Sequence, residues 1–107
     1  MQTSPSLPTP VARYFADKTE AVARWFTEDA VVIDERNEHR GRAAIAAWNA
    51  ASNAKYRFTT EPLGSSTEGD VLNVRAKVTG TFPDSPVELQ FGFTIEGGLI
   101  SRLEVAP

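Results

Sequence analysis

The hydrophobic pattern of the chain changes its period about halfway along. In the first half, apolar residues recur at helical spacing in three segments. Residues three and four positions apart share one face of a helix, so each segment predicts a helix with one buried side. The three stripes are Val11, Tyr14 and Phe15; Val22, Trp25 and Phe26; and Ile45, Trp48 and Ser52. The third helix is expected over residues 41–55, where repeated alanines favour helix.

A β-branched run separates the second predicted helix from the third. Residues 30–35 read AVVIDE, which is typical of a strand. Side chains alternate along a strand, so Ala30, Val32 and Asp34 are expected to share a face.

The second half alternates apolar and polar residues with a period of two, as in VLNVRAKVTGTF and VELQFGFTIE. This alternation predicts strands buried on one side only, which favours an antiparallel sheet. A further strand with Tyr56, Phe58 and Thr60 on one face is expected before them, and LISRLEV after them. Turns are expected at GSSTEGD (64–70), PDSP (83–86) and 97–98.

Helices followed by antiparallel strands predict an α+β domain. A chain of 107 residues is long enough for one core and not for two. The first ten residues hold three prolines, so residues 1–9 are expected to be a flexible lead-in, with a single domain over 10–107.

Composition excludes several classes of function. The net charge is −3 and the basic residues are scattered, whereas nucleic-acid binding needs a concentrated basic surface. There is no cysteine and only one histidine, which argues against a metal site. No stretch approaches the roughly 18 apolar residues of a membrane span. The N-terminus lacks the pattern of a secretory signal, so a cytoplasmic protein is expected.

One long segment resembles a known family. Residues 13–48, RYFADKTEAVARWFTEDAVVIDERNEHRGRAAIAAW, resemble the nuclear transport factor 2-like superfamily. The branch they match is that of SnoaL-like polyketide cyclases and ketosteroid isomerase-like proteins, most specifically in FTEDAVV and RGRAAI. With the order of elements, the resemblance covers about residues 10–105. It implies a cystatin-like cone, in which a curved antiparallel sheet wraps a long helix, with two shorter N-terminal helices, and leaves an apolar pocket at the open end.

The resemblance also implies roles for two residues. Asp34 matches the general-base aspartate at the end of the first strand, and Tyr14 matches the tyrosine that stabilises the oxyanion. The position of the family's second acid holds Leu89, with Glu88 and Gln90 beside it. Such chemistry needs no cofactor.

Each of these residues also has a structural interpretation. Asp34 could abstract a proton from carbon next to a carbonyl, because desolvation makes a carboxylate a stronger base. Alternatively it ends the strand in solvent, paired with Arg36 or Arg40. Tyr14 could polarise a substrate carbonyl, or be a core residue whose hydroxyl finds a nearby partner.

Several other side chains are candidates for the pocket. His39 could act as an acid or base or hold Asp34 in place, but its polar neighbours favour an exposed connection. Asn49 and Asn53 could bind a ligand, although a solvated helix face is the simpler interpretation. The aromatic and apolar residues proposed to contact a small apolar ligand are Trp25, Phe26, Val32, Trp48, Phe58, Phe91 and Phe93, with Trp48 at the rim.

Three functions follow. The first is an isomerase, cyclase or dehydratase that acts by proton transfer on a polyketide- or steroid-like carbonyl compound. The second is a non-catalytic ligand-binding or dimerisation module of the same fold. The third, least favoured, is epoxide hydrolysis with Asp34 and Arg75. The resemblance implies a homodimer formed through the sheet, whose polar residues Arg75, Lys77, Glu88 and Gln90 would make a wet interface.

Overall fold

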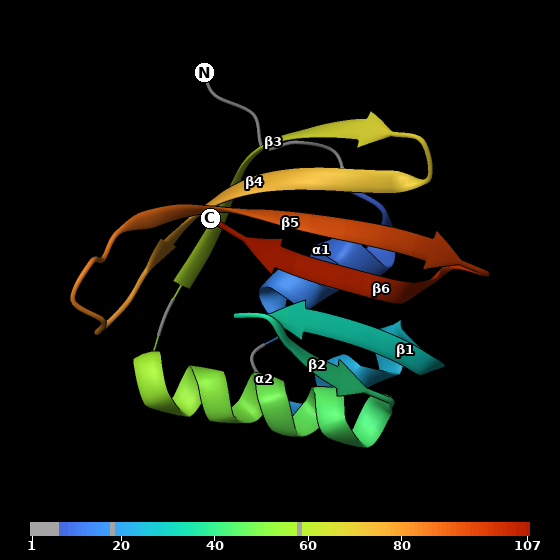
Figure 1. Ribbon diagram of the computed structural model, residues 1–107, viewed down its shortest axis with the longest axis horizontal. Helices are drawn as coiled ribbons and strands as arrows, with labels where there is room; N and C mark the ends of the chain where they lie inside the picture. Colours follow the sequence, from blue (N-terminus) through green and yellow to red (C-terminus); the bar gives the residue numbers. More distant parts are fainter. Residues whose placement is uncertain (1–6, 18, 58) are drawn as a thin grey trace.

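The computed structural model describes residues 7–17, 19–57 and 59–107. Figure 1 shows helices packed against a curved sheet, which confirms the predicted α+β class. The elements in chain order are α1 (Thr9–Ala16), the 3₁₀ helix η1 (Glu20–Trp25), β1 (Phe26–Asp34), β2 (Asn37–Arg40), α2 (Arg42–Tyr56), β3 (Thr59–Glu68), β4 (Val71–Thr79), β5 (Val87–Glu96) and β6 (Leu99–Ala106).

The second predicted helix is only a short 3₁₀ helix. Thr19 caps η1 by accepting a hydrogen bond from the Ala21 amide at 3.2 Å. Phe26 already belongs to β1, so Val22 and Phe26 are both fully buried but come from different elements. The i, i+4 spacing of Val22 and Phe26 therefore correctly predicted that both are buried, but it wrongly predicted that both belong to one helix.

The long helix begins and ends one residue later than expected. Gly41 precedes it with a positive φ of 89°, a backbone conformation that glycine adopts without strain. The helix continues to Tyr56, which corrects the expectation that Tyr56 belongs to a strand. Phe58 lies outside the described residues, and β3 begins at Thr59.

The strands form a single sheet in the order β2-β1-β6-β5-β4-β3. Neighbours are antiparallel except β1 and β6, which run parallel, so the sheet is mixed rather than purely antiparallel. A parallel pair needs a long connection, and here four other elements of the sheet and α2 lie between the two strands in the chain. The predicted curved sheet is otherwise confirmed.

Strand β2 was not predicted. NEHR has no apolar residue, and the sequence suggested an exposed connection there. In the structure these residues pair with β1, so that His39 lies opposite Val32. The two strands are joined by a two-residue turn, Glu35 and Arg36, with φ of 52° and 68°.

Strand β3 extends further than predicted. Residues 64–68 pair with β4, which reduces the expected turn to residues 69–70. β3 is an edge strand, so its polar side chains can stay in water while its backbone pairs with β4. Pro62 has no backbone N–H to donate, and it lies at a shift in the strand register, where a proline is tolerated.

The core lies between the helices and one face of the sheet. The period-two alternation of β4 and β5 is confirmed, since Val74, Ala76 and Phe93 are buried and Arg75 is exposed. Val11 of α1 and Ile45 of α2 belong to the same buried cluster. Among the described residues, no helix combines the length and apolar character needed to span a membrane.

Candidate functional site

A cavity of about 290 Å³ opens between the helices and the sheet. Figure 1 shows that the β4–β5 hairpin and the C-terminal end of α2 lie on the same side of the molecule. The cavity is lined by Tyr14, Asp34, Glu35, Trp48, Ser52, Val78, Phe82, Pro83, Val87, Leu89, Phe91 and Val105. Most of these side chains are apolar, so the few polar groups among them determine what the cavity can do chemically.

Asp34 is the last residue of β1 and is half-buried. Its Oδ2 accepts a 3.0 Å hydrogen bond from the indole Nε1 of Trp48 on α2. Arg40, one of the partners considered from the sequence, instead pairs with Glu38 at 3.1 Å on the surface. The strand alternation therefore directs the carboxylate toward the helices, and Trp48 holds one of its oxygens.

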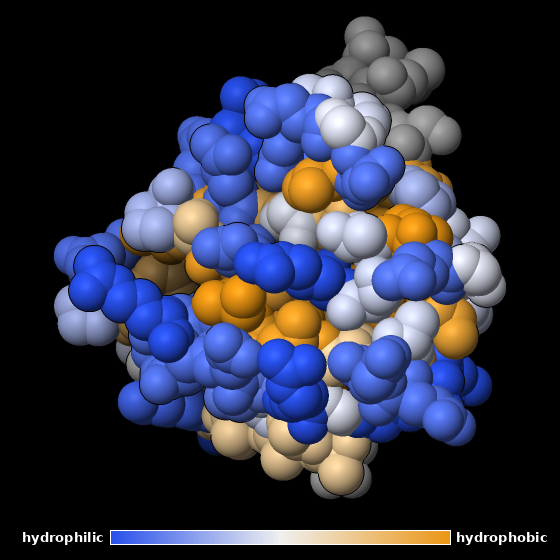
Figure 2. Space-filling model, turned by 45° about the vertical axis from the view of Figure 1, so that its right-hand side comes forward, coloured by the Kyte–Doolittle hydropathy of each residue, from blue (hydrophilic) through white to orange (hydrophobic). Residues whose placement is uncertain are grey.

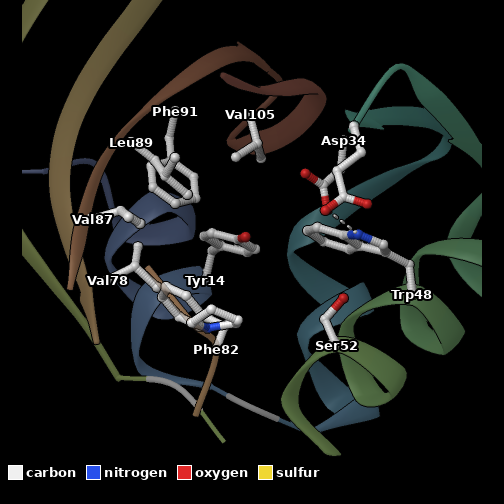
Figure 3. Close-up of a pocket in the computed structure, with 12 residues that line it drawn as sticks. Tyr14, Asp34, Trp48, Ser52, Val78, Phe82, Val87, Leu89, Phe91 and Val105 are labelled. Atoms are coloured by element: carbon white, nitrogen blue, oxygen red, sulfur yellow. Dashed lines mark hydrogen bonds between the residues drawn. The ribbon is translucent and has the colours of Figure 1, made fainter. Parts of the chain in front are cut away.

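Tyr14 lies in the middle of the cavity, and its side chain is 9% exposed. Its ring is parallel to that of Trp48, at 6.4 Å between centroids, and meets Phe93 edge-on at 5.6 Å. Figure 3 shows its hydroxyl directed toward the side that holds Asp34 and Trp48. That hydroxyl forms no hydrogen bond with any residue in the described part of the chain.

Burial raises the pKa of Tyr14 above its ordinary value, and the negative charge of Asp34 raises it further. Both effects disfavour the tyrosinate. Tyr14 therefore keeps its proton at neutral pH and remains available as a hydrogen-bond donor.

The position of the family's second acid is apolar in the structure as well. Leu89 lines the cavity, whereas Glu88 and Gln90 are exposed, since neighbours along a strand face opposite sides. Ser52 supplies the remaining hydroxyl at the cavity. In Figure 3 it lies on the same side as Trp48.

The proposed ligand-contacting residues divide into three groups. Trp48 and Phe91 line the cavity. Phe26, Val32 and Phe93 are fully buried in the core and do not line it. Trp25 lies elsewhere, with the guanidinium carbon of Arg13 at 6.0 Å from its ring, and Phe58 is outside the described residues.

His39 is half-buried rather than part of an exposed connection, because β2 pairs its backbone opposite Val32. Its ring lies 5.8 Å from that of Trp48. His39 does not line the cavity, so it supports Trp48 and does not face a ligand directly.

The two asparagines of α2 are structural, which corrects the expectation of a solvated face. Asn49 is 4% exposed and its Nδ2 donates to the Thr19 carbonyl at 3.1 Å, which ties α2 to the start of η1. Asn53 Nδ2 donates to the Asn49 carbonyl at 2.8 Å. Neither residue lines the cavity.

Sequence reasoning missed much of the cavity wall. Val78 lies opposite Val87, and Ala76 opposite Leu89, so these inward positions meet at one end of the sheet. Their alternation marked them as buried, but only the strand register shows that Val78, Val87 and Leu89 come together at the cavity, next to the core residue Ala76. Within the described ranges, no three His, Cys, Asp or Glu side chains are placed to hold a metal ion.

Comparisons with known proteins agree with this geometry. The profile of the SnoaL-like domain family matches residues 11–103. A candidate polyketide cyclase from Sinorhizobium meliloti is 44% identical, with a TM-score of 0.86 over 92% of this chain and 94% of that one. No curated protein sequence matches the chain.

Two more distant structures are also similar. The epoxide hydrolase/cyclase-like enzyme SalBIII, which has a role in pyran ring formation in the polyether salinomycin, is 25% identical, with a TM-score of 0.69 over 92% of this chain and 87% of that one. A candidate SnoaL-like polyketide cyclase from Jannaschia is 20% identical, with a TM-score of 0.73 over 98% and 90% of the two chains, and shows likeness of fold alone.

Proposed function

Because this chain belongs to the SnoaL-like domain family, as its sequence resemblance predicted, we propose that its cavity binds a small apolar carbonyl compound and moves a proton on it. The reaction class is an isomerisation, cyclisation or dehydration. Asp34 is the general base and Tyr14 the oxyanion donor. The observation that carries the proposal is the unpartnered hydroxyl of Tyr14, directed toward the side of Asp34 within a mainly apolar cavity.

The proposed chemistry follows from the two groups. Asp34 removes a proton from the carbon next to the substrate carbonyl, and the electron pair of that C–H bond forms the enolate. The developing negative charge lies on the carbonyl oxygen, where the O–H of Tyr14 donates a hydrogen bond. Return of the proton from Asp34 to a different carbon completes an isomerisation.

Trp48 has a positioning role in this proposal. Its N–H binds Oδ2 of Asp34, so Oδ1 is the oxygen left to accept the substrate proton. A carboxylate fixed by one hydrogen bond loses less freedom when the substrate arrives, which favours a reactive geometry.

Hydrogen exchange tests the proposal without knowledge of the natural substrate. The protein is incubated in heavy water with a panel of small cyclic ketones, and loss of the α-proton signal is followed by NMR. Asp34→Asn is expected to reduce exchange by about 10²- to 10⁴-fold, the usual contribution of a general base. Tyr14→Phe is expected to reduce it by about 10²- to 10³-fold, as loss of an oxyanion donor does.

Glu88→Gln is the matched control, because it makes the same kind of change on the exposed face of β5. It is expected to leave the exchange rate unchanged. Exchange that is equally fast in wild type and Asp34→Asn, or that no ketone in the panel undergoes, would contradict the proposal.

A non-catalytic ligand-binding module is the second candidate. Leu89 favours it, because an apolar side chain occupies the place of the family's second acid and leaves Tyr14 as the main donor to an enolate. In that case the cavity would bind ketones without exchanging their protons. Epoxide hydrolysis is disfavoured, because Arg75 pairs with Glu88 at 3.3 Å on exposed side chains and does not line the cavity with Asp34.

A homodimer formed through the outer face of the sheet is the proposed assembly. That face carries the exposed ion pairs Arg75–Glu88 and Arg102–Glu104. On the side shown in Figure 2, hydrophobic residues form small patches between hydrophilic ones. An interface that contains these exposed ion pairs would depend on salt concentration, so sedimentation at low and high ionic strength tests whether the dimer forms. A monomer at every salt concentration would contradict it.

A further inference from the structure

We propose that the carbonyl compound bound in this cavity also carries a positively charged nitrogen, so that the substrates are apolar carbonyl compounds with an ammonium group and not acids. The inference rests on the cavity of the proposed function and specifies its substrate class. It concerns binding, and it can therefore be tested apart from proton transfer.

The charge of the cavity is the first argument. Two carboxylates, Asp34 and Glu35, line it, and no Lys, Arg or His does so within the described residues. Neither carboxylate forms an ion pair with any residue in that part of the chain. An anionic ligand would be repelled here, whereas a cation would neutralise charge that the protein leaves unpaired.

The hydrogen-bonding groups are the second argument. The single indole N–H at the site is already donated to Oδ2 of Asp34, which leaves Oδ1 as an acceptor. Tyr14 is more than nine-tenths buried, and its unpartnered hydroxyl oxygen is directed to the same side. A protonated amine is a donor only, so it complements this set of acceptors.

The aromatic rings are the third argument. Tyr14, Trp48, Phe82 and Phe91 all line the cavity. The faces of aromatic rings attract organic cations, and tryptophan and tyrosine do so most strongly. Rings next to unpaired carboxylates are the usual combination in sites that bind substituted ammonium groups.

The two ends of the cavity differ, which orients the ligand. Figure 3 shows Asp34 and Trp48 on one side and Val78, Val87 and Leu89 on the other, with Tyr14 between them. The charged nitrogen is therefore placed near Asp34 and Glu35, and the apolar body of the ligand against the strands. A volume of about 290 Å³ is at the lower end of the range of about 300–1,000 Å³ for ligand pockets, so the ligand is small.

The test compares two molecules of the same shape. Protonated N,N-dimethylbenzylamine and isobutylbenzene differ only in whether the central atom is a charged N–H or a neutral C–H. Trp25→Phe removes the tryptophan that lies away from the cavity, so Trp48 is the remaining fluorophore. Each compound is titrated into this variant and into wild type, and binding is followed by fluorescence and by amide NMR shifts.

The cation is expected to bind at least about tenfold more tightly than the neutral compound, and less tightly as salt is added. Phenylacetate, a comparable anion, is expected not to bind. Asp34→Asn and Glu35→Gln keep the side-chain shape, and each is expected to weaken the cation several-fold while the neutral compound is unaffected. Glu88→Gln, on the other face of the sheet, is the control and should change neither affinity.

Equal affinity for the two compounds in wild type would overturn the inference, as would no binding of either one at millimolar concentration. The comparison in wild type stands even where a variant fails to fold. If the protein prefers the cation but does not exchange the α-protons of ketones, the proposed catalysis is contradicted and this inference is supported. If the protein exchanges ketone α-protons but binds the two compounds equally, the proposed catalysis is supported and this inference is contradicted.

Discussion

The indole N–H of Trp48 is bonded to Oδ2 of Asp34 at 3.0 Å, which joins the middle of α2 to the end of β1. The bond crosses from a helix to the sheet at the only carboxylate of β1 that lines the cavity. It therefore contributes both to the packing of α2 and to the orientation of Asp34.

Trp48→Phe is expected to test both contributions. Phenylalanine keeps an aromatic wall but cannot donate to the carboxylate. Hydrogen bonds to charged groups contribute about 1.5–3 kcal/mol, and the partial exposure of this one reduces the expected loss to about 1 kcal/mol. Urea unfolding measures this loss, and ketone exchange should fall with it. Trp25→Phe is the matched control, and an equal loss of exchange in that variant would contradict the positioning role.

Tyr14 is expected to resist ionisation in alkali. Burial and the Asp34 carboxylate raise the pKa of Tyr14 above the ordinary value of about 10. Its contribution to the free energy of unfolding is fully present below the unfolded-state pKa and is lost as pH rises through the folded-state pKa. Stability should therefore decline above about pH 10, and Tyr14→Phe should make this decline shallower.

Absorbance of tyrosinate measures the same effect directly. The chain has two tyrosines, so in Tyr56→Phe the signal comes from Tyr14 alone. Ionisation is expected only well above the ordinary tyrosine pKa or together with unfolding. Model tyrosines ionise at about pH 10. Ionisation of Tyr14 at that pH in the folded protein would show that its hydroxyl is not desolvated.

Asp17 is expected to contribute to the loss of folding stability at low pH. The side-chain hydroxyl of Thr19 donates to Oδ1 of Asp17 at 2.6 Å and its amide donates at 2.8 Å, which lowers the pKa of Asp17. A lowered pKa contributes stability that is present above the unfolded value of about 3.9 and is lost as pH falls through the folded value. Asp17→Asn should therefore unfold with a weaker dependence on pH in this acid range. Asp70→Asn, exposed in the β3–β4 turn, is the control, and equal pH slopes for the two variants would contradict the effect.

Much of the fold could be predicted because local pattern and burial agree. The stripe of α1 and the alternation of β1 were enough to direct Tyr14 and Asp34 inward. Their catalytic roles stay a prediction, because position alone does not establish chemistry. Period-two alternation likewise identified the buried face of β4 and β5.

The rest depended on relations between distant segments. The bond from Trp48 to Asp34 needs the packing angle of α2, and the cavity wall needs the register of β4 with β5. Asn49 is polar, so no hydrophobic pattern could mark it as buried, and only the position of Thr19 explains it. Strand β2 has no apolar residue and is ordered by backbone pairing with β1.

The turn between β1 and β2 brings the two strands together, and a substitution in it is expected to stabilise the protein. Glu35 and Arg36 both have positive φ, as in the type I′ turns that suit two-residue hairpins. Glycine adopts this conformation without the steric cost that a Cβ brings, although it also gives the unfolded chain more freedom. A left-handed residue with a Cβ costs about 1–2 kcal/mol, and the freedom of glycine in the unfolded chain offsets about 0.5–1 kcal/mol of the gain from removing that Cβ. Arg36→Gly is therefore expected to raise the free energy of unfolding by about 0.5–1 kcal/mol.

Arg36→Ala is the matched control for this change, because it removes the same side chain and keeps the Cβ. Urea unfolding of the two variants separates backbone strain from loss of the guanidinium group. If the alanine variant is as stable as the glycine variant, the positive φ at Arg36 stores no strain. If only glycine stabilises the protein, the turn holds β2 in place at a cost, and that cost keeps Glu35 at the cavity beside Asp34.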